Sequence, residues 1–175
     1  MGDTKNFARQ TGEPTFEAAA YLRRYGADPH AVSQLFKEDD ASVILRAKII
    51  TEMKKPIPGL AVSVHSGGAQ NDRNVSVVVA QAADELLTMN DIHVSAVLNE
   101  SDDGVSISAR SDGSVNVQSM MEELGGGGHQ TVGCVQIKGA KAEDLIPKII
   151  EMAKEQMKES DSDEGISAEG RKEVG

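Results

Sequence analysis

Beyond residue 59, stretches in which apolar and polar residues alternate are interleaved with stretches whose apolar residues recur at helical spacing. Strands are therefore expected over residues 60–65, 92–98, 105–110 and 131–138, and helices over residues 75–88, 115–124 and 141–158. Such an interleaved order is typical of an α/β or α+β domain, in which helices cover a face of a sheet. Of the two we expect α/β: a mixed β-sheet with helices packed on it, preceded by a helical linker segment.

The first 58 residues have a helical pattern. Helices are expected over residues 14–25, 29–36 and 40–50, with Asp28 as the N-cap of the second. The third predicted helix carries an apolar stripe at helical spacing, formed by Val43, Ile44, Ala47 and Ile50. Two prolines and a glycine at residues 56–59 then indicate a turn or linker. The expected domains are a helical segment at 1–58, a sheet domain at 59–159 and a disordered acidic tail at 160–175.

Composition limits the core, the partners and the compartment. Aromatic residues make up 3% of the chain, so Val, Ile, Leu, Ala and Met have to build the core. A formal net charge of −10 excludes binding to duplex DNA through bulk charge. Cys134 is the single cysteine, which excludes an internal disulfide and fits a reducing cytoplasmic setting. Its place in an expected strand predicts a small buried residue rather than a nucleophile.

Four consecutive glycines, Gly125, Gly126, Gly127 and Gly128, precede His129 between an expected helix and an expected strand. One glycine is enough to end a helix, and each further glycine costs about 0.5–1 kcal/mol relative to alanine. The run therefore indicates close approach to the backbone, and consecutive exposed N–H groups form a concavity that binds anions. A flexible loop without a ligand is the alternative.

A second candidate site follows from residues at a spacing of two. Ser106, Ser108 and Arg110 are expected to project from one face of the same strand, where the planar guanidinium of arginine suits phosphate. Ser114 is the expected cap of the next helix, whose first turn carries Asn116, and helix N-termini attract anions. A solvated strand face beside ordinary turns is the alternative.

Five stretches of the sequence also match a known pattern: DTKNF at 3–7, TFEAAAYLRRYGAD at 15–28, AQAADELLTM at 80–89, DDGVSISARSDGSVNVQ at 102–118 and GGGGH at 125–129. Together they resemble the C-terminal part of DHH-family phosphoesterases. The GGGGH motif is similar to that of DHH-associated domains in general. The SISARS and AQAADELLTM stretches resemble the branch that hydrolyses cyclic di-AMP.

The resemblance implies a division of labour. An N-terminal DHH domain would bind two manganese ions, and the DHH-associated domain would bind the nucleotide that is hydrolysed to pApA. Asp3 matches a metal ligand of the family. The residues that match its substrate-binding positions are Ser108, Arg110, Asn116, Gly125, Gly126, Gly127, Gly128 and His129.

The sequence contains no Asp-His-His motif. We therefore expect a C-terminal part that lacks the DHH domain, holds no metal of its own and is inactive alone. The parent protein is expected to be anchored in a membrane, with this part facing the cytoplasm. The helical surface left by the absent domain predicts either mobility or self-association as a homodimer.

Two other functions stay open. The first is a part of a phosphoesterase that acts on short oligonucleotides or on 3′-phosphoadenosine phosphate. The second is a module that binds a small nucleotide without catalysis.

Overall fold

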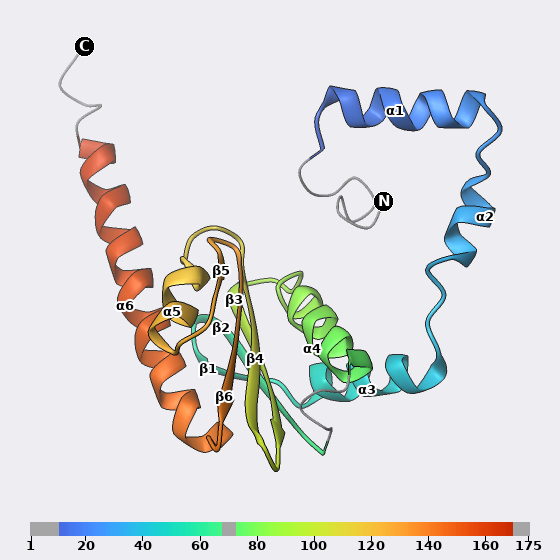
Figure 1. Cartoon of the computed structure of the whole chain (residues 1–175). Helices are drawn as coiled ribbons and strands as arrows, with labels where there is room; N and C mark the ends of the chain where they lie inside the picture. Colours follow the sequence, from blue (N-terminus) through green and yellow to red (C-terminus); the bar gives the residue numbers. More distant parts are fainter. Residues whose placement is uncertain (1–10, 68–72, 170–175) are drawn as a thin grey trace. The chain divides into compact units, whose positions relative to one another are not determined.

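A computed structural model describes residues 11–67 and 73–169 of the chain, with side chains as far as Lys158 (Figure 1). The chain divides into two compact units, Met1–Asp39 and Asp40–Gly175. Each unit is described by itself. None of the described helices is both long and apolar enough to cross a lipid bilayer.

The first unit holds two helices, α1 (Glu13–Arg24) and α2 (Pro29–Gln34), close to the predicted spans. The predicted cap is confirmed: the Asp28 carboxylate accepts the backbone N–H groups of His30 and Ala31, at 3.0 and 3.4 Å. Neither helix has a buried residue. The large exposed apolar side chains of this unit are Phe16, Tyr21, Leu22, Tyr25, Leu35 and Phe36.

The second unit is built on a six-stranded sheet with the order β1-β2-β3-β4-β6-β5. Its strands are β1 (Lys54–Ile57), β2 (Gly59–Ser66), β3 (Ile92–Ser101), β4 (Gly104–Ser111), β5 (Gly127–His129) and β6 (Val132–Lys138). β2 and β3 are parallel, whereas all other neighbours are antiparallel. The predicted mixed sheet of the α/β class is therefore confirmed.

Helices cover both faces of this sheet (Figure 1). α5 (Val117–Glu123) and α6 (Ala142–Glu169) pack on one face, and α3 (Asp40–Thr51) and α4 (Arg73–Leu86) pack on the other. The core under α5 and α6 includes Leu60, Leu98, Ile107, Met120 and Ile149. The core under α3 and α4 includes Ile49, Ala61, Val79, Leu86 and Val97. As the composition requires, both cores are aliphatic.

The α3/α4 face also buries hydroxyl groups. The Ser63 hydroxyl donates to the Ile49 carbonyl of α3 at 2.7 Å, and the Ser95 hydroxyl donates to the Ala83 carbonyl of α4 at 2.6 Å. Both serines are almost inaccessible to solvent. Each strand hydroxyl thus finds its partner on a helix backbone, which satisfies the polar group and fixes the helix on the sheet.

Three segments differ from the sequence-based expectation. Residues 54–57, expected as a linker, form β1, because a proline is tolerated on an edge strand. Residues 127–129, expected as loop, form β5 at the other edge. α6 runs to Glu169 and so enters the segment expected to be disordered, since no proline follows Pro147. Residues 170–175 lie outside the described part.

The predicted apolar stripe of α3 is wrong. Ile49 is the buried residue of this helix, whereas Val43 is 45% and Ile44 is 68% exposed. The helix is apolar on more than one side, and contacts with α4 decide which side is buried. Arg46 helps to decide it, because its Nε lies 3.2 Å from a carboxylate oxygen of Glu85 on α4.

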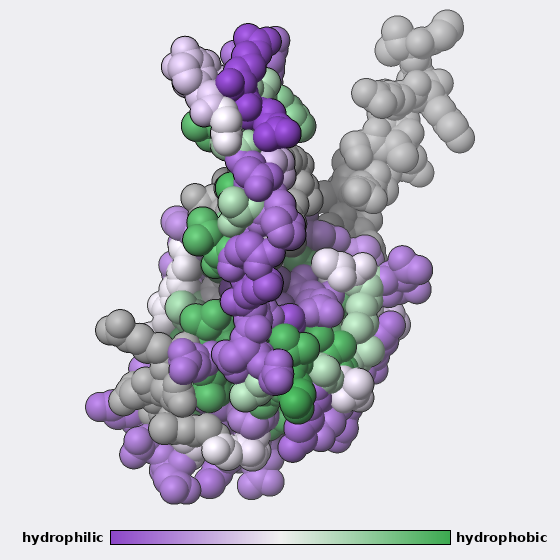
Figure 2. Space-filling view, turned by 90° about the vertical axis from the view of Figure 1, so that its right-hand side faces the viewer, coloured by the Kyte–Doolittle hydropathy of each residue, from purple (hydrophilic) through white to green (hydrophobic). Residues whose placement is uncertain are grey.

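The surface on the side of α3 and α4 shows the result. Hydrophobic patches lie among the hydrophilic residues of this surface (Figure 2). The exposed large apolar residues of these two helices are Val43, Ile44 and Val77.

A pair of substitutions on α3 tests which side of the helix is buried. We expect Ile49→Ala to lower the free energy of unfolding by about 3 kcal/mol, because it leaves a cavity in the core. Ile44→Ala should change it by less than about 0.5 kcal/mol, because Ile44 is exposed. Urea unfolding of both variants measures the difference. A larger loss for Ile44→Ala would contradict the structure.

Candidate functional site

A groove of about 870 Å³ opens on the α3/α4 face of the sheet. It forms there because α4 packs on β3 and β4 and leaves β6 largely uncovered. Four elements line it: α4, β4, β6 and the glycine run. The lining residues are Ser76, Val79, Ser106, Ile107, Ser108, Gly125, Gly126, Gly127, Cys134, Val135 and Gln136. None of these side chains carries a formal charge.

The first two residues of the glycine run end α5 and also line the groove. The N–H of Gly125 donates to the Glu122 carbonyl at 2.9 Å, and the N–H of Gly126 donates to the Met121 carbonyl at 2.7 Å. These bonds satisfy carbonyls that a helix end would otherwise leave unpaired. Two of the four N–H groups therefore serve the helix end and are not available to an anion.

Close approach explains two of the four glycines. A Cβ on Gly126 would lie 2.3 Å from the Cys134 carbonyl oxygen, and a Cβ on Gly128 would lie 2.1 Å from that of Val132. The backbone of β6 thus occupies the space of a side chain at both positions. A Cβ on Gly127 would meet nothing within 4 Å. Gly125 is open in the same way, so Gly125 and Gly127 are the two members of the run that face open space in the groove.

The period-two prediction for β4 is confirmed. Val105, Ile107 and Ala109 belong to the core under α5 and α6. The intervening side chains, those of Ser106, Ser108 and Arg110, therefore project from the α3/α4 face. Ser106 and Ser108 line the groove, whereas Arg110 is absent from its lining.

Arg110 forms an ion pair with α4. Its side chain is 11% exposed, and its Nε donates to the Asp84 carboxylate at 3.0 Å. Its Nη1 donates to the Ala109 carbonyl at 2.9 Å. These bonds use two of the five N–H donors of the guanidinium. Arg110, which was predicted to contact phosphate, therefore also connects β4 to α4.

His129 lies in the same row as Arg110. Strand register pairs Arg110 of β4 with Val132 of β6, and Val132 with His129 of β5. Paired residues share a face, so Arg110 and His129 project from the groove's face with one strand between them. Gly128 and His129 are not part of the groove lining.

Asn116 caps α5 and does not line the groove. Its side-chain oxygen accepts the backbone N–H groups of Gln118 at 3.1 Å and of Ser119 at 3.4 Å. The predicted cap, Ser114, instead bonds to Asp112. α5 packs on the face of the sheet opposite to Ser108, and Asn116 and the glycine run lie at opposite ends of this helix. The structure therefore does not bring Asn116 together with Ser108 and the glycines.

Three groove residues with polar side chains escaped sequence reasoning. Cys134 is exposed and lines the groove, so the prediction that it is buried is wrong. It projects from the face of β6 opposite to the buried Val135. Gln136 follows Cys134 at the strand spacing of two, which was the available signal. Ser76 is the fourth residue of α4, and nothing in its local sequence distinguishes it.

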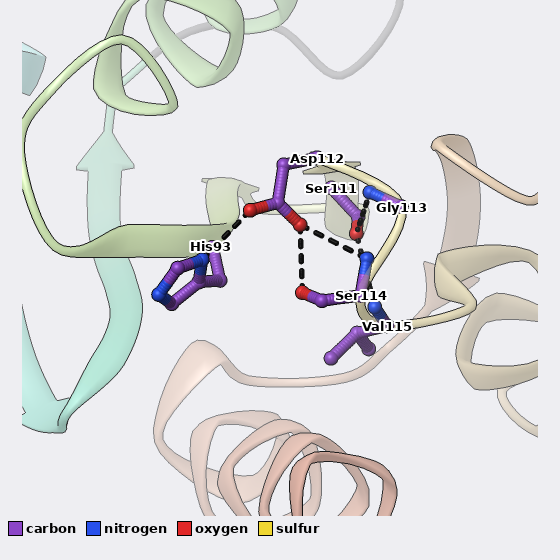
Figure 3. A network of polar contacts seen from close by, with 6 residues as sticks. All are labelled: His93, Ser111, Asp112, Gly113, Ser114 and Val115. Carbon is purple, nitrogen blue, oxygen red and sulfur yellow. Dashed lines mark hydrogen bonds and ion pairs between the residues drawn. The ribbon is translucent and has the colours of Figure 1, made fainter. Parts of the chain in front are cut away.

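A polar network closes the turn between β4 and α5 (Figure 3). His93 Nδ1 lies 2.7 Å from one carboxylate oxygen of Asp112. The other oxygen accepts the backbone N–H and the hydroxyl of Ser114, at 2.9 and 2.6 Å. A catalytic triad would need the serine hydroxyl on the histidine. Here it bonds to the aspartate, so the network shapes the turn.

Family comparison matches residues 60–159 to the DHHA1 domain. The chain belongs to the DHHA1 domain family. The matched range includes every residue that lines the groove. The groove is therefore a feature of the DHHA1 domain itself.

Relatives carry the same region within longer proteins. The cyclic-di-AMP phosphodiesterase GdpP of Geobacillus thermodenitrificans is 45% identical over 136 residues, which are 77% of this chain and 20% of GdpP. The cyclic-di-AMP phosphodiesterase PdeA of Listeria monocytogenes is 41% identical over 149 residues, 85% of this chain and 22% of PdeA. The chain thus spans about one-fifth of the length of these relatives.

A solved structure shares the fold. The crystal structure of an exopolyphosphatase-related protein from Bacteroides fragilis matches with a TM-score of 0.77 at 16% sequence identity. The match covers 92% of this chain and 49% of that one. At this identity the likeness shows the fold alone.

The described side chains do not fit a manganese site. Asp3, the predicted metal ligand, lies outside the described residues. In the part of the chain that the structure describes, no three His, Cys, Asp or Glu side chains gather as a metal site requires.

Neighbouring glycines provide a matched test of the groove's construction. We expect Gly126→Ala to lower the free energy of unfolding by about 2 kcal/mol, because its Cβ collides with the backbone of β6. Gly127→Ala should change it by less than about 1 kcal/mol, because its Cβ enters open space. Chemical denaturation measures both. Equal losses would contradict the placement of the run.

The Asp112 network predicts a pH dependence. Burial alone would raise the pKa of Asp112, but hydrogen bonds from Ser114 and His93 outweigh burial and lower the pKa. The carboxylate therefore stabilises the fold above about pH 4, the unfolded value, and this stability is lost as the pH falls through the folded pKa.

We expect Asp112→Asn to lower the free energy of unfolding by about 1 kcal/mol at pH 7, a figure reduced for solvent screening. The loss should shrink at pH 3. Asp102→Asn, in the exposed turn after β3, is the control. Urea unfolding at both pH values measures the effect, and a loss independent of pH would rule out the carboxylate's role.

Proposed function

We propose that this chain is the nucleotide-binding part of a phosphodiesterase that hydrolyses cyclic di-AMP to the linear dinucleotide pApA. The observation that carries the proposal is an uncharged, hydrogen-bonding groove in a DHHA1 domain that is 45% and 41% identical to two named cyclic-di-AMP phosphodiesterases. The rival substrates of the superfamily, short oligoadenylates, enter the test below.

The groove suits the neutral part of a nucleotide. The hydroxyls of Ser76, Ser106 and Ser108 and the carboxamide of Gln136 can each donate and accept hydrogen bonds. A base edge and ribose hydroxyls present the same mixture of donors and acceptors. The groove's volume of about 870 Å³ also lies within the usual range for small-molecule sites. The base and ribose are therefore assigned to the groove.

The phosphates are assigned to Arg110 and His129, which lie beside the groove on the same face of the sheet. Arg110 lies two residues from Ser108 on β4, and His129 lies two residues from Gly127 on β5. Two residues along a strand are roughly 7 Å. A nucleoside in the groove thus places its phosphate near these two side chains. Arg110 keeps donors beyond those bonded to Asp84 and Ala109, and they can hold a phosphate oxygen.

Hydrolysis itself is assigned to a DHH domain outside this chain, which would supply the manganese ions. When bound, these ions would polarise the phosphodiester and activate water. The part played by this chain is to hold the nucleotide in place for attack. The exposed apolar side chains of α1 and α2 are assigned to the contact with that domain, because a surface of this kind normally has a partner.

Calorimetric titration of the chain with cyclic di-AMP tests the proposal. We expect binding that Gly127→Val weakens by about tenfold or more, because its side chain enters the groove without disturbing β6. Gln118→Leu, on α5 and outside the groove, is the control and should leave the affinity unchanged.

A short linear oligoadenylate is titrated in parallel, because it represents the rival substrate. A short oligoadenylate that binds while cyclic di-AMP does not would replace the proposed substrate by an oligonucleotide. Binding of cyclic di-AMP that Gly127→Val leaves intact would place the site elsewhere.

A further inference from the structure

Asn99 of β3 is buried without a partner. Its residue exposure is 0%, and neither its side-chain nitrogen nor its side-chain oxygen has a hydrogen bond. Among the described residues, no other side chain combines burial with unpartnered polar atoms. Native proteins rarely leave such groups unpaired, because they have lost water and gained nothing in exchange. A carboxamide in this state indicates a partner that binds from outside the chain.

Asn99 projects from the face that carries the groove. Val97 belongs to the core under α3 and α4, and Leu98 belongs to the core on the other face. The alternation along β3 therefore places Asn99 on the α3/α4 face. Register pairs Asn99 with Ser106 of β4, and Ser106 with Gln136 of β6.

Ser106 and Gln136 both line the groove. Asn99 thus continues a row of polar side chains from the groove into the interior, and its carboxamide lies next to the first strand that forms the groove's wall. A ligand that reaches the Ser106 hydroxyl lies one strand away from this amide, and side-chain rotations that would open a path to it are common on binding.

The other buried polar side chains of this face all serve the helices. Ser63 bonds to α3, Ser95 bonds to α4, and Arg110 pairs with Asp84 of α4. Asn99 is the exception, because neither helix offers it a partner. Fixing the helices therefore does not explain an amide at this position.

We propose that Asn99 recognises the base of the bound nucleotide and selects adenine. Its side-chain oxygen would accept the 6-amino group of adenine, and its side-chain nitrogen would donate to N7, which is the usual bidentate pairing of asparagine with this base. Guanine presents two acceptors on the same edge, so the oxygen would face an acceptor. This inference rests on the proposed function, in which the groove holds an adenine nucleotide.

Asn99→Leu separates this role from a structural one. Leucine has nearly the shape of asparagine and removes both unpaired polar atoms. If the amide serves a ligand, Asn99→Leu without ligand melts at a higher temperature than the unaltered chain, because replacing unpaired buried polar groups by apolar ones is favourable. If the amide supports the fold, the variant melts at a lower temperature.

Binding provides the second readout. Calorimetry with cyclic di-AMP and cyclic di-GMP should show that the unaltered chain prefers the adenine ligand by about tenfold or more. Asn99→Leu should weaken the binding of cyclic di-AMP by about tenfold, so that the affinities for the two ligands become similar. Gln118→Leu replaces an exposed carboxamide by leucine on α5, where the amide bonds to Glu122. It should not raise the melting temperature and should leave the preference unchanged.

The possible outcomes distinguish a failure of the role of Asn99 from a failure of the proposed function. A lower melting temperature of Asn99→Leu, or an unchanged preference for adenine, overturns the role of Asn99 and leaves the proposed function standing. Binding of AMP but not of cyclic di-AMP, with adenine preference lost in Asn99→Leu, supports Asn99 and removes the proposed substrate. Failure of the chain to bind any adenine nucleotide overturns both.

Discussion

The ion pair between Arg110 and Asp84 joins α4 to β4, and the groove depends on where α4 lies on the sheet. The Ser95 hydroxyl adds a second tie at Ala83, the residue before Asp84. Both ties hold the C-terminal half of α4. The N-terminal half is then positioned to supply Ser76 and Val79 to the groove, while β6 stays open. An arginine expected to serve the ligand thus also builds the wall of its site.

Local periodicity was enough to predict most of the sheet and one side of the site. Buried Val105 and Ile107 dictate that Ser106 and Ser108 face the other way, whatever packs on them. Periodicity failed where several faces are apolar. On α3 it favoured Ile44, although contacts with α4, which lies far along the sequence, bury Ile49 instead. The Asp84 partner of Arg110 is equally invisible without the fold.

The glycine run shows a different limit. Four glycines indicate that something comes close to the backbone, but a strand and a ligand make the same demand. At Gly126 and Gly128 the close neighbour is β6, whereas Gly125 and Gly127 have open space beside them and line the groove. Asn116 and Ser114 were both good caps by residue type. The conformation of the turn makes Asn116 the cap, and this places its side chain outside the groove lining.

Cys134 gives the groove a chemical handle. The chain has one cysteine, and its thiol is exposed among the residues that line the groove. A thiol-reactive reagent therefore has a single attachment point, and that point lies inside the site. A bound molecule would shield the sulfur from alkylation. The rate of alkylation thus becomes a direct report of occupancy, in a chain that needs no engineered label.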